Sequence, residues 1–304
     1  MNQFQLLLHS AQDIKQKRIS TKTVLAYKRN IAMYEKEILS IDGAPHPFPI
    51  NEELSIAFLE MMRKRDVSHA YLMSFVTSFA NYCKENKIFD FTKTYEFEKY
   101  KEGLMKTMKG GSFPNAKEPM TPKMLIDISE LINHADRLQL RDMAMYSMMF
   151  YGFLRFSDCS NLKPTDIFTE DDGKLRINIR FSKMDQSGEG ENVFIFPTDK
   201  PYCAIKWYMK YVRYCETNGV ACNFAMVPNT FKRRLDNYLK MINLDHDIKS
   251  YAGHSFRRGG AHFAALNGIQ DCIIKAHGRW KSAVYTRYTS VQMIEAGSRI
   301  TIAI

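Results

Sequence analysis

The sequence predicts a mainly helical protein with one small β-hairpin, an α+β fold divided between two domains. Three observations predict it. The 304 residues are enough for two domains of ordinary size. Apolar residues recur at helical spacing along most of the chain, and only one short stretch changes to strand-like alternation. With 45% hydrophobic and 25% charged residues, the composition is globular and excludes a disordered or fibrous protein.

Four amphipathic helices are predicted in the first hundred residues. The first covers residues 20–42, with Ser20 or Thr21 as its N-cap and with apolar side chains recurring every three or four residues. The other helices follow the same period, over residues 51–64, 69–86 and 95–108. Together they predict a small helical bundle.

A linker is predicted over residues 109–117, where two glycines, a serine and a proline stand between two lysines. It divides the chain into a first domain over residues 1–108 and a second over residues 118–304. In the second domain a helix begins at Thr121-Pro122, and the helical pattern continues to about Tyr151.

The predicted hairpin follows that helical stretch. Residues 175–181 and 192–196 alternate or are rich in β-branched and aromatic residues, with a polar turn over residues 183–190 between them. Helical patterns return from Pro201 onward. The second domain is therefore predicted to be helical with a single hairpin.

The charge balance favours a polyanionic partner. The chain has 43 Lys and Arg against 33 Asp and Glu, a formal net charge of +10 and a pI near 9.2. Nucleic acid is the commonest partner of such a surface, and an ordinary basic soluble surface is the alternative. Four basic residues of the first predicted helix lie off its apolar stripe: Lys22, Lys28, Arg29 and Lys36.

The six cysteines include no C-x-x-C and no pair closer than seven residues, which argues against a zinc knuckle and a disulfide scaffold. Reduced thiols inside a cell are expected. The N-terminus lacks the basic start and apolar core of a secretory signal. The longest apolar run, residues 143–154, is too short to cross a bilayer, so no membrane association is expected.

Four separated segments contain the residues from which a reaction centre can be built. They contribute Arg155 and Asp158, Lys183, His254 and Arg257, and Trp280 followed by Tyr285 and Tyr288. Each has an ordinary alternative. Arg155 pairs with Asp158 at a helix end, Lys183 is a solvated turn residue, the His254-x-x-Arg257 pair caps and charges a helix, and the aromatic residues pack in a core.

Taken together, the same residues describe a phosphate site with a nucleophile. Two arginines offer bidentate donors to a phosphodiester and stabilise the charge of a pentavalent phosphorane. A lysine protonates a leaving alkoxide, a histidine assists proton transfer, and a tyrosine is a suitable covalent nucleophile. The sequence shows no carboxylate cluster to hold magnesium ions, so neither a metal nor another cofactor is expected.

The order Arg155, Lys183, His254-x-x-Arg257, Trp280, Tyr288 resembles the tyrosine recombinase/integrase family. The segment before the linker resembles that family's helical, SAM-like core-binding domain, which binds DNA, and the segment from about residue 118 resembles its catalytic domain. The motifs His-Ser-Phe-Arg-Arg-Gly-Gly-Ala and Gly-Arg-Trp-Lys-Ser are most similar to recombinases of eukaryotic mobile elements of the DIRS and crypton type.

This resemblance implies a role for each matched residue. Arg155 and Arg257 clamp the phosphate, and Asp158 orients Arg155. Lys183 is the general acid on the leaving 5′-oxygen, and His254 assists proton transfer. In the same way, Trp280 takes the position of the family's His or Trp, and Tyr288 is the nucleophile. Apart from these matched positions, the basic residues predicted to contact DNA are Lys22, Lys28, Arg29 and Arg258.

The register of the nucleophile departs from the family's pattern. The family often places the tyrosine nine residues after the His/Trp position. Counting from Trp280 reaches Thr289, one residue beyond Tyr288, and counting from His277 reaches Thr286. Tyr285 therefore remains an alternative nucleophile.

The resemblance implies a site-specific DNA recombinase that cleaves and rejoins DNA through a 3′-phosphotyrosyl intermediate, without metal or ATP. Its expected role is integration or excision of a mobile element, in the nucleus. The implied partners are double-stranded DNA and further copies of the chain, in a tetramer on paired sites. The apolar tail over residues 291–304 either packs on its own domain or docks into a neighbouring protomer.

Two other functions stay open. A type IB topoisomerase-like enzyme uses a related cationic site, although His254 favours the recombinase because those topoisomerases generally have a basic residue there. A domesticated protein that binds DNA without cutting it is the other, although every catalytic position is filled.

Overall fold

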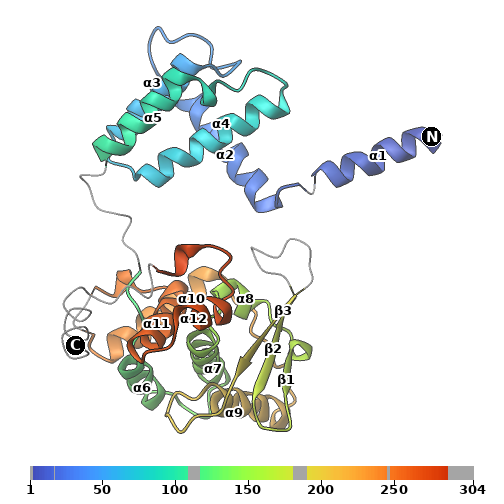
Figure 1. The fold of residues 1–304 in the computed structure, drawn as a ribbon, viewed down its shortest axis with the longest axis vertical. Helices are drawn as coiled ribbons and strands as arrows, with labels where there is room; N and C mark the ends of the chain where they lie inside the picture. The colour runs from blue at the N-terminus through green and yellow to red at the C-terminus, as the bar shows by residue number, and fades with distance from the viewer. Residues whose placement is uncertain (1–2, 17, 109–116, 181–189, 245–246, 287–304) are drawn as a thin grey trace. The chain divides into compact units, whose positions relative to one another are not determined.

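The chain forms two compact units, and each has its own large hydrophobic core (Figure 1). The computed structural model describes residues 3–16, 18–108, 117–180, 190–244 and 247–286. One compact unit is Met1–Asn115 and the other is Ala116–Ile304. The predicted linker falls almost wholly outside the described residues. The roles expected of the two parts, core binding and catalysis, stay predictions.

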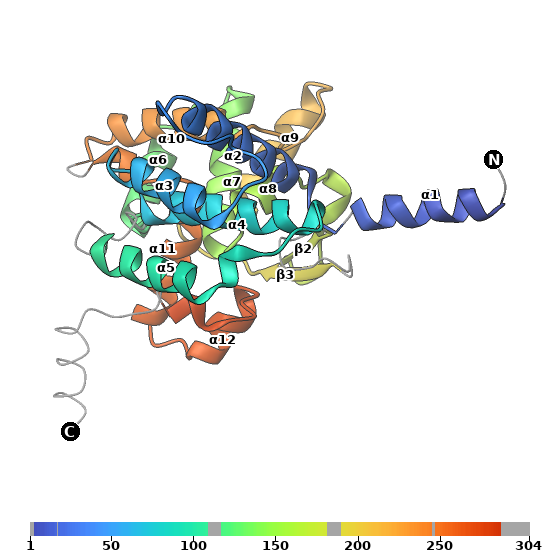
Figure 2. The same ribbon diagram turned by 90° about the horizontal axis from the view of Figure 1, so that it is seen from above.

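The first unit is all helical. Its α-helices are α1 (Gln3–Gln16), α2 (Thr21–Leu39), α3 (Glu52–Arg63), α4 (His69–Glu85) and α5 (Tyr95–Met108), with a 3-10 turn η1 (Phe91–Lys93) before α5. Helix α2 packs against α3 and α4 (Figure 2). The side chains of Ser20, Asn51 and Ser68 cap α2, α3 and α4 by accepting from the backbone N–H three residues ahead. Helix α1 has no counterpart among the predicted helices.

Aromatic residues fill the core of this unit. Tyr34 lies 5.4 Å from Phe58 and 5.2 Å from Phe79 between ring centroids, both edge to face. Phe58 meets Phe75 in the same way at 4.9 Å. The α2 stripe that the periodicity identified thus ends in a packed core, and Lys22, Lys28 and Arg29 remain exposed.

The second unit is built around one buried helix. Its α-helices are α6 (Pro122–Glu130), α7 (Arg137–Tyr151), α8 (Phe156–Ser160), α9 (Ala204–Thr217), α10 (Pro228–Met241), α11 (Gly253–Leu266) and α12 (Asp271–His277). Its 3-10 turns are η2 (Pro164–Asp166), η3 (Ile248–Ser250) and η4 (Ala283–Tyr285). Every residue of α7 from Leu140 to Phe150 is buried, and α7 packs against α9 and α11. A helix buried on all sides lies in the centre of a domain, and the buried charges of α7, Arg141 and Asp142, are paired with each other.

The helical pattern predicted from Thr121 to about Tyr151 is divided between two helices. Helix α6 ends at Glu130 and α7 begins at Arg137. The side chain of Asp136 caps α7 by accepting from the N–H groups of Leu138 and Gln139. The intervening residues contain neither glycine nor proline, so the apolar period runs through the break and conceals it.

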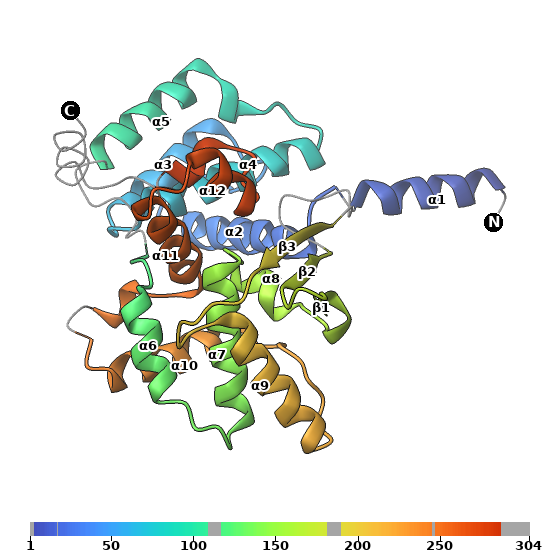
Figure 3. The ribbon, with the colours of Figure 1, turned by 60° about the horizontal axis from the view of Figure 1, so that its bottom comes forward.

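The sheet has three antiparallel strands in the order β1–β2–β3 (Figure 3). They are β1 (Ile167–Thr169), β2 (Leu175–Ile179) and β3 (Glu191–Ile195). Ile177 is paired with Ile167 on one side and Val193 on the other, and all three are buried on one face. The mainly helical α+β prediction is confirmed. The hairpin prediction missed β1, whose three residues are too few to show an alternation.

The segment over residues 117–120, called the strap below, runs against the start of α11. Glu118 N–H donates to Ser250 O and Met120 N–H to Ser255 O, both at 2.9 Å. A Cβ on Gly259 would lie 2.0 Å from Met120 O, so glycine is required at this close approach. Half-buried Arg258 donates to the carbonyl of Lys117 at 2.8 Å, which gives it a structural contact beside its predicted one with DNA.

All six cysteines are free thiols. Across the described ranges, no helix combines the length and apolar character needed to cross a membrane.

Candidate active site

His254 and Arg257 are both in α11 but differ in exposure. His254, one residue into the helix, is exposed, whereas Arg257 is 1% exposed. The Arg257 guanidinium donates from Nη1 to Phe153 O and from Nη2 to Gly278 O. Its central carbon lies 4.2 Å from the centre of the Trp280 ring. One buried cation therefore joins α11 to the segments that follow α7 and α12.

Glycines let α11 approach the Arg155 segment closely. A Cβ on Gly260 would lie 2.1 Å from Phe150 O and 2.6 Å from the ring of Phe153. A Cβ on Gly253 would lie 2.7 Å from the Cβ of Phe156, the residue after Arg155. The structure thus brings the segment that contains Arg155 close to the helix that contains His254 and Arg257.

Arg155 is the N-cap residue of α8, and Asp158 in that helix contacts both its backbone and its side chain. Its backbone N–H donates to Asp158 Oδ2 at 3.1 Å, and its Nη1 lies 3.6 Å from the same oxygen. The Asp158 side chain is 2% exposed and that of Arg155 is 19% exposed. This geometry fits the predicted orienting role of Asp158 and leaves part of the Arg155 guanidinium accessible to an anion.

Trp280 belongs to a small buried cluster with Phe153, Ala261 and Ile274, called the Trp280 cluster below. Tyr285 packs against it, with its ring centroid 6.0 Å from that of Trp280. Trp280 packs in a core, as the alternative expected, and its ring also covers Arg257. Its role in the reaction stays a prediction. For Tyr285 the contact favours a packing role over that of nucleophile.

Arg279 is a site residue that the sequence reasoning missed. Its Nη2 lies 3.3 Å from Asp158 Oδ2, and its Nη1 donates to Gly152 O at 3.4 Å. Its Nε is 3.4 Å from Glu191 Oε2, an ion-pair distance without hydrogen-bond geometry. Burial lowers the pKa of Arg279, although the charges of Asp158 and Glu191 act in the opposite direction. A spacing signal was present, because Arg279 stands nine residues before Tyr288.

Two buried residues of this site have left-handed backbone angles. Phe153 has φ +46° and Arg279 has φ +56°. The other described non-glycine residues with positive φ, Asp66, Lys87 and Asn243, are exposed. Strained backbone of this kind gathers at functional sites.

His277 adds no positive charge to the site. Burial lowers its pKa, and the neighbouring guanidinium groups of Arg279 and Arg257 lower it further. Its Nε2 lies 2.7 Å from Tyr151 O, which fits a neutral ring that donates through Nε2. The nearby positive charges of Arg279 and Arg257 thus disfavour a protonated His277 ring.

Two predicted site residues, Lys183 and Tyr288, lie outside the described residues, as does the tail over residues 291–304. Their roles stay predictions. In the portion of the chain that the structure does describe, no three His, Cys, Asp or Glu side chains gather to hold a metal ion.

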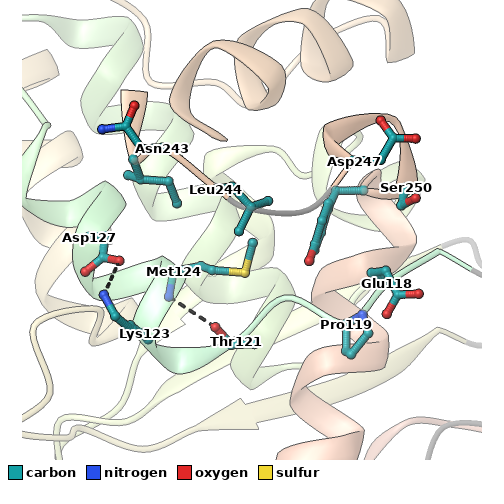
Figure 4. Close-up of a pocket in the computed structure, with 12 residues that line it drawn as sticks. Glu118, Pro119, Thr121, Lys123, Met124, Asp127, Asn243, Leu244, Asp247 and Ser250 are labelled. Atoms are coloured by element: carbon teal, nitrogen blue, oxygen red, sulfur yellow. Dashed lines mark hydrogen bonds and ion pairs between the residues drawn. The ribbon is translucent and has the colours of Figure 1, made fainter. Parts of the chain in front are cut away.

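An open hollow of about 690 Å³ lies elsewhere in the second unit, between the start of α6 and the segment after α10 (Figure 4). Three carboxylates line it, Glu118, Asp127 and Asp247, and Lys123 is paired with Asp127 at 2.7 Å. Acidic lining disfavours a phosphate, and none of the candidate site residues lines this hollow.

The chain is similar to known recombinases. It is 27% identical over 187 residues to an integrase/recombinase XerD homolog of Selenomonas ruminantium, an alignment covering 57% of this chain and 53% of the relative. The chain therefore spans about half the length of that curated relative. No protein-family model matches the chain.

Solved structures with DNA show the same architecture. The XerH site-specific recombinase bound to a palindromic difH substrate has a TM-score of 0.66 at 13% identity, covering 90% of this chain and 79% of that one. The Tn1549 transposon integrase with transposon right end DNA has a TM-score of 0.65 at 12% identity, covering 98% of both chains. For a lambda integrase dimer bound to a COC′ core site the TM-score is 0.59 at 15% identity, covering 96% of both.

The chain has the tyrosine recombinase fold. Within that fold, the sequence similarity to the XerD homolog also supports the tyrosine recombinase/integrase family. Within this fold Arg155 is paired with Asp158 and Arg257 is stacked on Trp280, while His254 is exposed at the start of α11; the catalytic roles of these residues stay predictions.

Proposed function

We propose that the protein is a tyrosine recombinase that cuts and rejoins DNA strands without metal or ATP. The observation that supports it best is the close approach of the Arg155 segment to α11, the helix that contains His254 and Arg257, within a recombinase fold. Guanidinium groups clamp a phosphodiester and stabilise the charge that develops on it. The Arg155 side chain is 19% exposed. Arg257 is 1% exposed and its Nη1 and Nη2 donate to backbone carbonyls, so Arg155 is the arginine that this structure leaves open to a phosphate.

The proposed chemistry balances within the DNA and the chain. The Tyr288 oxygen attacks phosphorus as its phenolic proton passes to His254, the bond to the 5′-oxygen breaks, and Lys183 supplies that oxygen with a proton. A 5′-hydroxyl of a partner strand then attacks the 3′-phosphotyrosine, and Tyr288 leaves as the strand is rejoined. In the rejoining step Lys183 takes the proton of the attacking 5′-hydroxyl and His254 returns one to Tyr288.

The partners follow from the same chemistry. The similar recombinase and integrase structures are bound to DNA, and we propose double-stranded DNA here too. The first unit is the proposed core-binding domain, with Lys22, Lys28 and Arg29 exposed on α2. Exchange between two sites calls for four protomers, so a tetramer on paired sites is part of the proposal.

The biological role is proposed from motif similarity. The resemblance to DIRS and crypton recombinases points to integration or excision of a mobile element in a nucleus. One of the similar structures is a transposon integrase, which supports the mobile-element role. The sequence relative is from Selenomonas ruminantium and lends no support to the nuclear location.

A covalent adduct tests the proposed activity. Purified protein is incubated with a nicked suicide substrate, in which the cleaved end diffuses away, and the protein–DNA adduct is resolved on a denaturing gel. We expect an adduct with wild type and with Tyr285→Phe, and none with Tyr288→Phe, whose DNA affinity stays near that of wild type.

The other outcomes identify the alternatives. An adduct lost in Tyr285→Phe but kept in Tyr288→Phe would exchange the roles of the two tyrosines. Loss in neither variant would exclude this tyrosine mechanism. Tight DNA binding with no wild-type adduct would favour a domesticated binding protein, and relaxation of supercoiled DNA without exchanged products would favour the topoisomerase-like enzyme.

A further inference from the structure

Arg279 follows the C-cap of α12, Gly278, and has a backbone conformation that favours glycine. Its N–H donates to Ala276 O at 2.9 Å, and the N–H of Trp280 donates to Lys275 O at 3.1 Å. These are the two bonds of the Schellman motif, in which glycine is the usual residue where Arg279 stands with φ +56°. The chain therefore has an arginine at a position where the backbone conformation favours glycine.

Other helix ends in the chain show what is unusual about this one. Helices α9 and α11 end in the same pair of bonds with Gly219 and Gly268 at the matching position. Lys87 after α4 and Asn243 after α10 are non-glycine residues there, and both are exposed. Arg279 instead has a side chain that is only 6% exposed.

The Arg279 guanidinium bridges three segments that are distant in sequence. It meets Asp158 in α8, Glu191 at the start of β3 and the carbonyl of Gly152 after α7. A planar fork with five N–H donors suits several acceptors at once. Asp158 uses the same Oδ2 for Arg155, so the bridge extends to the accessible arginine.

The bridge leaves little of Arg279 for DNA. Nη1 and Nη2 donate to acceptors of the protein, Nε lies at ion-pair distance from Glu191, and the side chain is only 6% exposed. A phosphate ligand would need donors directed to solvent. The contacts suit a residue that holds other groups in place.

We propose that Arg279 is a positioning residue for strand cleavage. It fixes the Asp158–Arg155 pair, the first residue of β3 and the segment beginning at Trp280 relative to one another. This inference rests on the proposed function. Displacement of reacting groups by about 1 Å reduces rates by about a hundredfold, which sets the expected scale of the effect.

The test compares two glycine variants. Arg279→Gly removes the bridge and relieves the backbone, and Asn243→Gly relieves the same motif at the end of α10. Single-turnover adduct formation is measured at saturating DNA, with DNA affinity and thermal unfolding alongside. We expect Arg279→Gly to cleave about a hundredfold more slowly with DNA affinity within a few-fold of wild type. Asn243→Gly should cleave at the wild-type rate.

Two further variants address the mechanism of the effect. Arg279→Lys keeps the charge but not the fork, and we expect an intermediate rate. Glu191→Gln alone should slow cleavage, and combining it with Arg279→Gly should give no further loss, because Glu191 acts through the bridge. If Glu191 and Arg279 served only the fold, the losses of cleavage rate in the two single variants would add in the double variant.

Each outcome decides for or against the positioning role. Wild type that forms no adduct overturns the proposed function and this inference with it. An active wild type with Arg279→Gly equally active overturns this inference alone. Should Arg279→Gly fail to fold, Arg279→Lys decides: a rate equal to wild type overturns the inference, and a reduced rate in folded protein supports it.

Discussion

The guanidinium of Arg257 lies against the ring face of Trp280, 4.2 Å from the ring centre, while two of its nitrogens donate to the backbone. A cation stacked in this way on a buried indole is stabilised by the ring quadrupole. The contact explains how the chain keeps a fully buried arginine next to an apolar cluster.

Replacing Trp280 tests this contact. We expect Trp280→Ala to lower the free energy of unfolding by about 3–5 kcal/mol, because a large buried ring is lost from the Trp280 cluster. Trp280→Phe keeps an aromatic face over Arg257 and should lose much less. Urea unfolding of the two variants measures both values. Equal losses would show that ring packing on Arg257 contributes nothing.

Lys183 is tested by changing the leaving group. Lys183→Ala should slow cleavage of an ordinary phosphodiester far more than that of a 5′-bridging phosphorothiolate, because a thiolate leaves without a proton. Adduct formation is timed on both substrates. Equal slowing would assign Lys183 to phosphate binding or to the solvated turn.

Salt dependence tests the basic face of α2. Lys28 and Arg29 are exposed, and each phosphate contact contributes about 0.9 to the slope of log affinity against log salt. The double variant Lys28→Gln/Arg29→Gln should flatten that slope by about 2. Arg65→Gln is the control, because Arg65 is paired with Glu37 at 2.6 Å. An unchanged slope in the double variant would remove these residues from the DNA interface.

Acidification tests the buried ring of His277. Burial lowers its pKa from the ordinary 6.5, so the folded state binds fewer protons than the unfolded state just below that pH. Stability should therefore fall as the pH drops through 6.5. In His277→Gln, which keeps an N–H donor for Tyr151 O, the fall in Tm between about pH 7.5 and pH 5.5 should be smaller. The same fall in both proteins would contradict this assignment.

A pair of glycines tests the close approach of the strap. Gly259→Ala places a Cβ 2.0 Å from Met120 O and should destabilise the second unit by about 1–3 kcal/mol or more. A Cβ on Gly103 in α5 would meet no atom within 4 Å, so Gly103→Ala should stabilise by about 0.5–1 kcal/mol. Calorimetry measures both changes, and opposite signs are expected.

Local signals explain what the sequence predicted well. Ser20 and Asn51 cap helices whose apolar periods start directly after them, so those boundaries can be read from neighbouring residues. The break before Asp136 has no glycine or proline, and the period on either side hides it. Strand β1 depends on pairing with β2 rather than on its own three residues.

The candidate site also has some contacts that local sequence predicts and others that it does not. Arg155 and Asp158 are three residues apart, and their contact follows from helix geometry. The contacts of Arg279 join residues more than eighty positions apart, to Glu191 and Asp158, and no local pattern specifies them. The stacking of Arg257 on Trp280 joins α11 to the segment after α12, so the sequence predicts both residues at the site but not their contact.

The strap has a practical consequence for protein engineering. Because Lys117, Glu118 and Met120 are bonded to α11 and to the residues just before it, they belong to the same module as His254 and Arg257. A chimera that exchanges the first unit for another DNA-binding module should place its junction upstream of Lys117. A junction after Met120 would remove the backbone hydrogen bonds that anchor this helix, and the new fusion would lose activity even where its graft binds DNA.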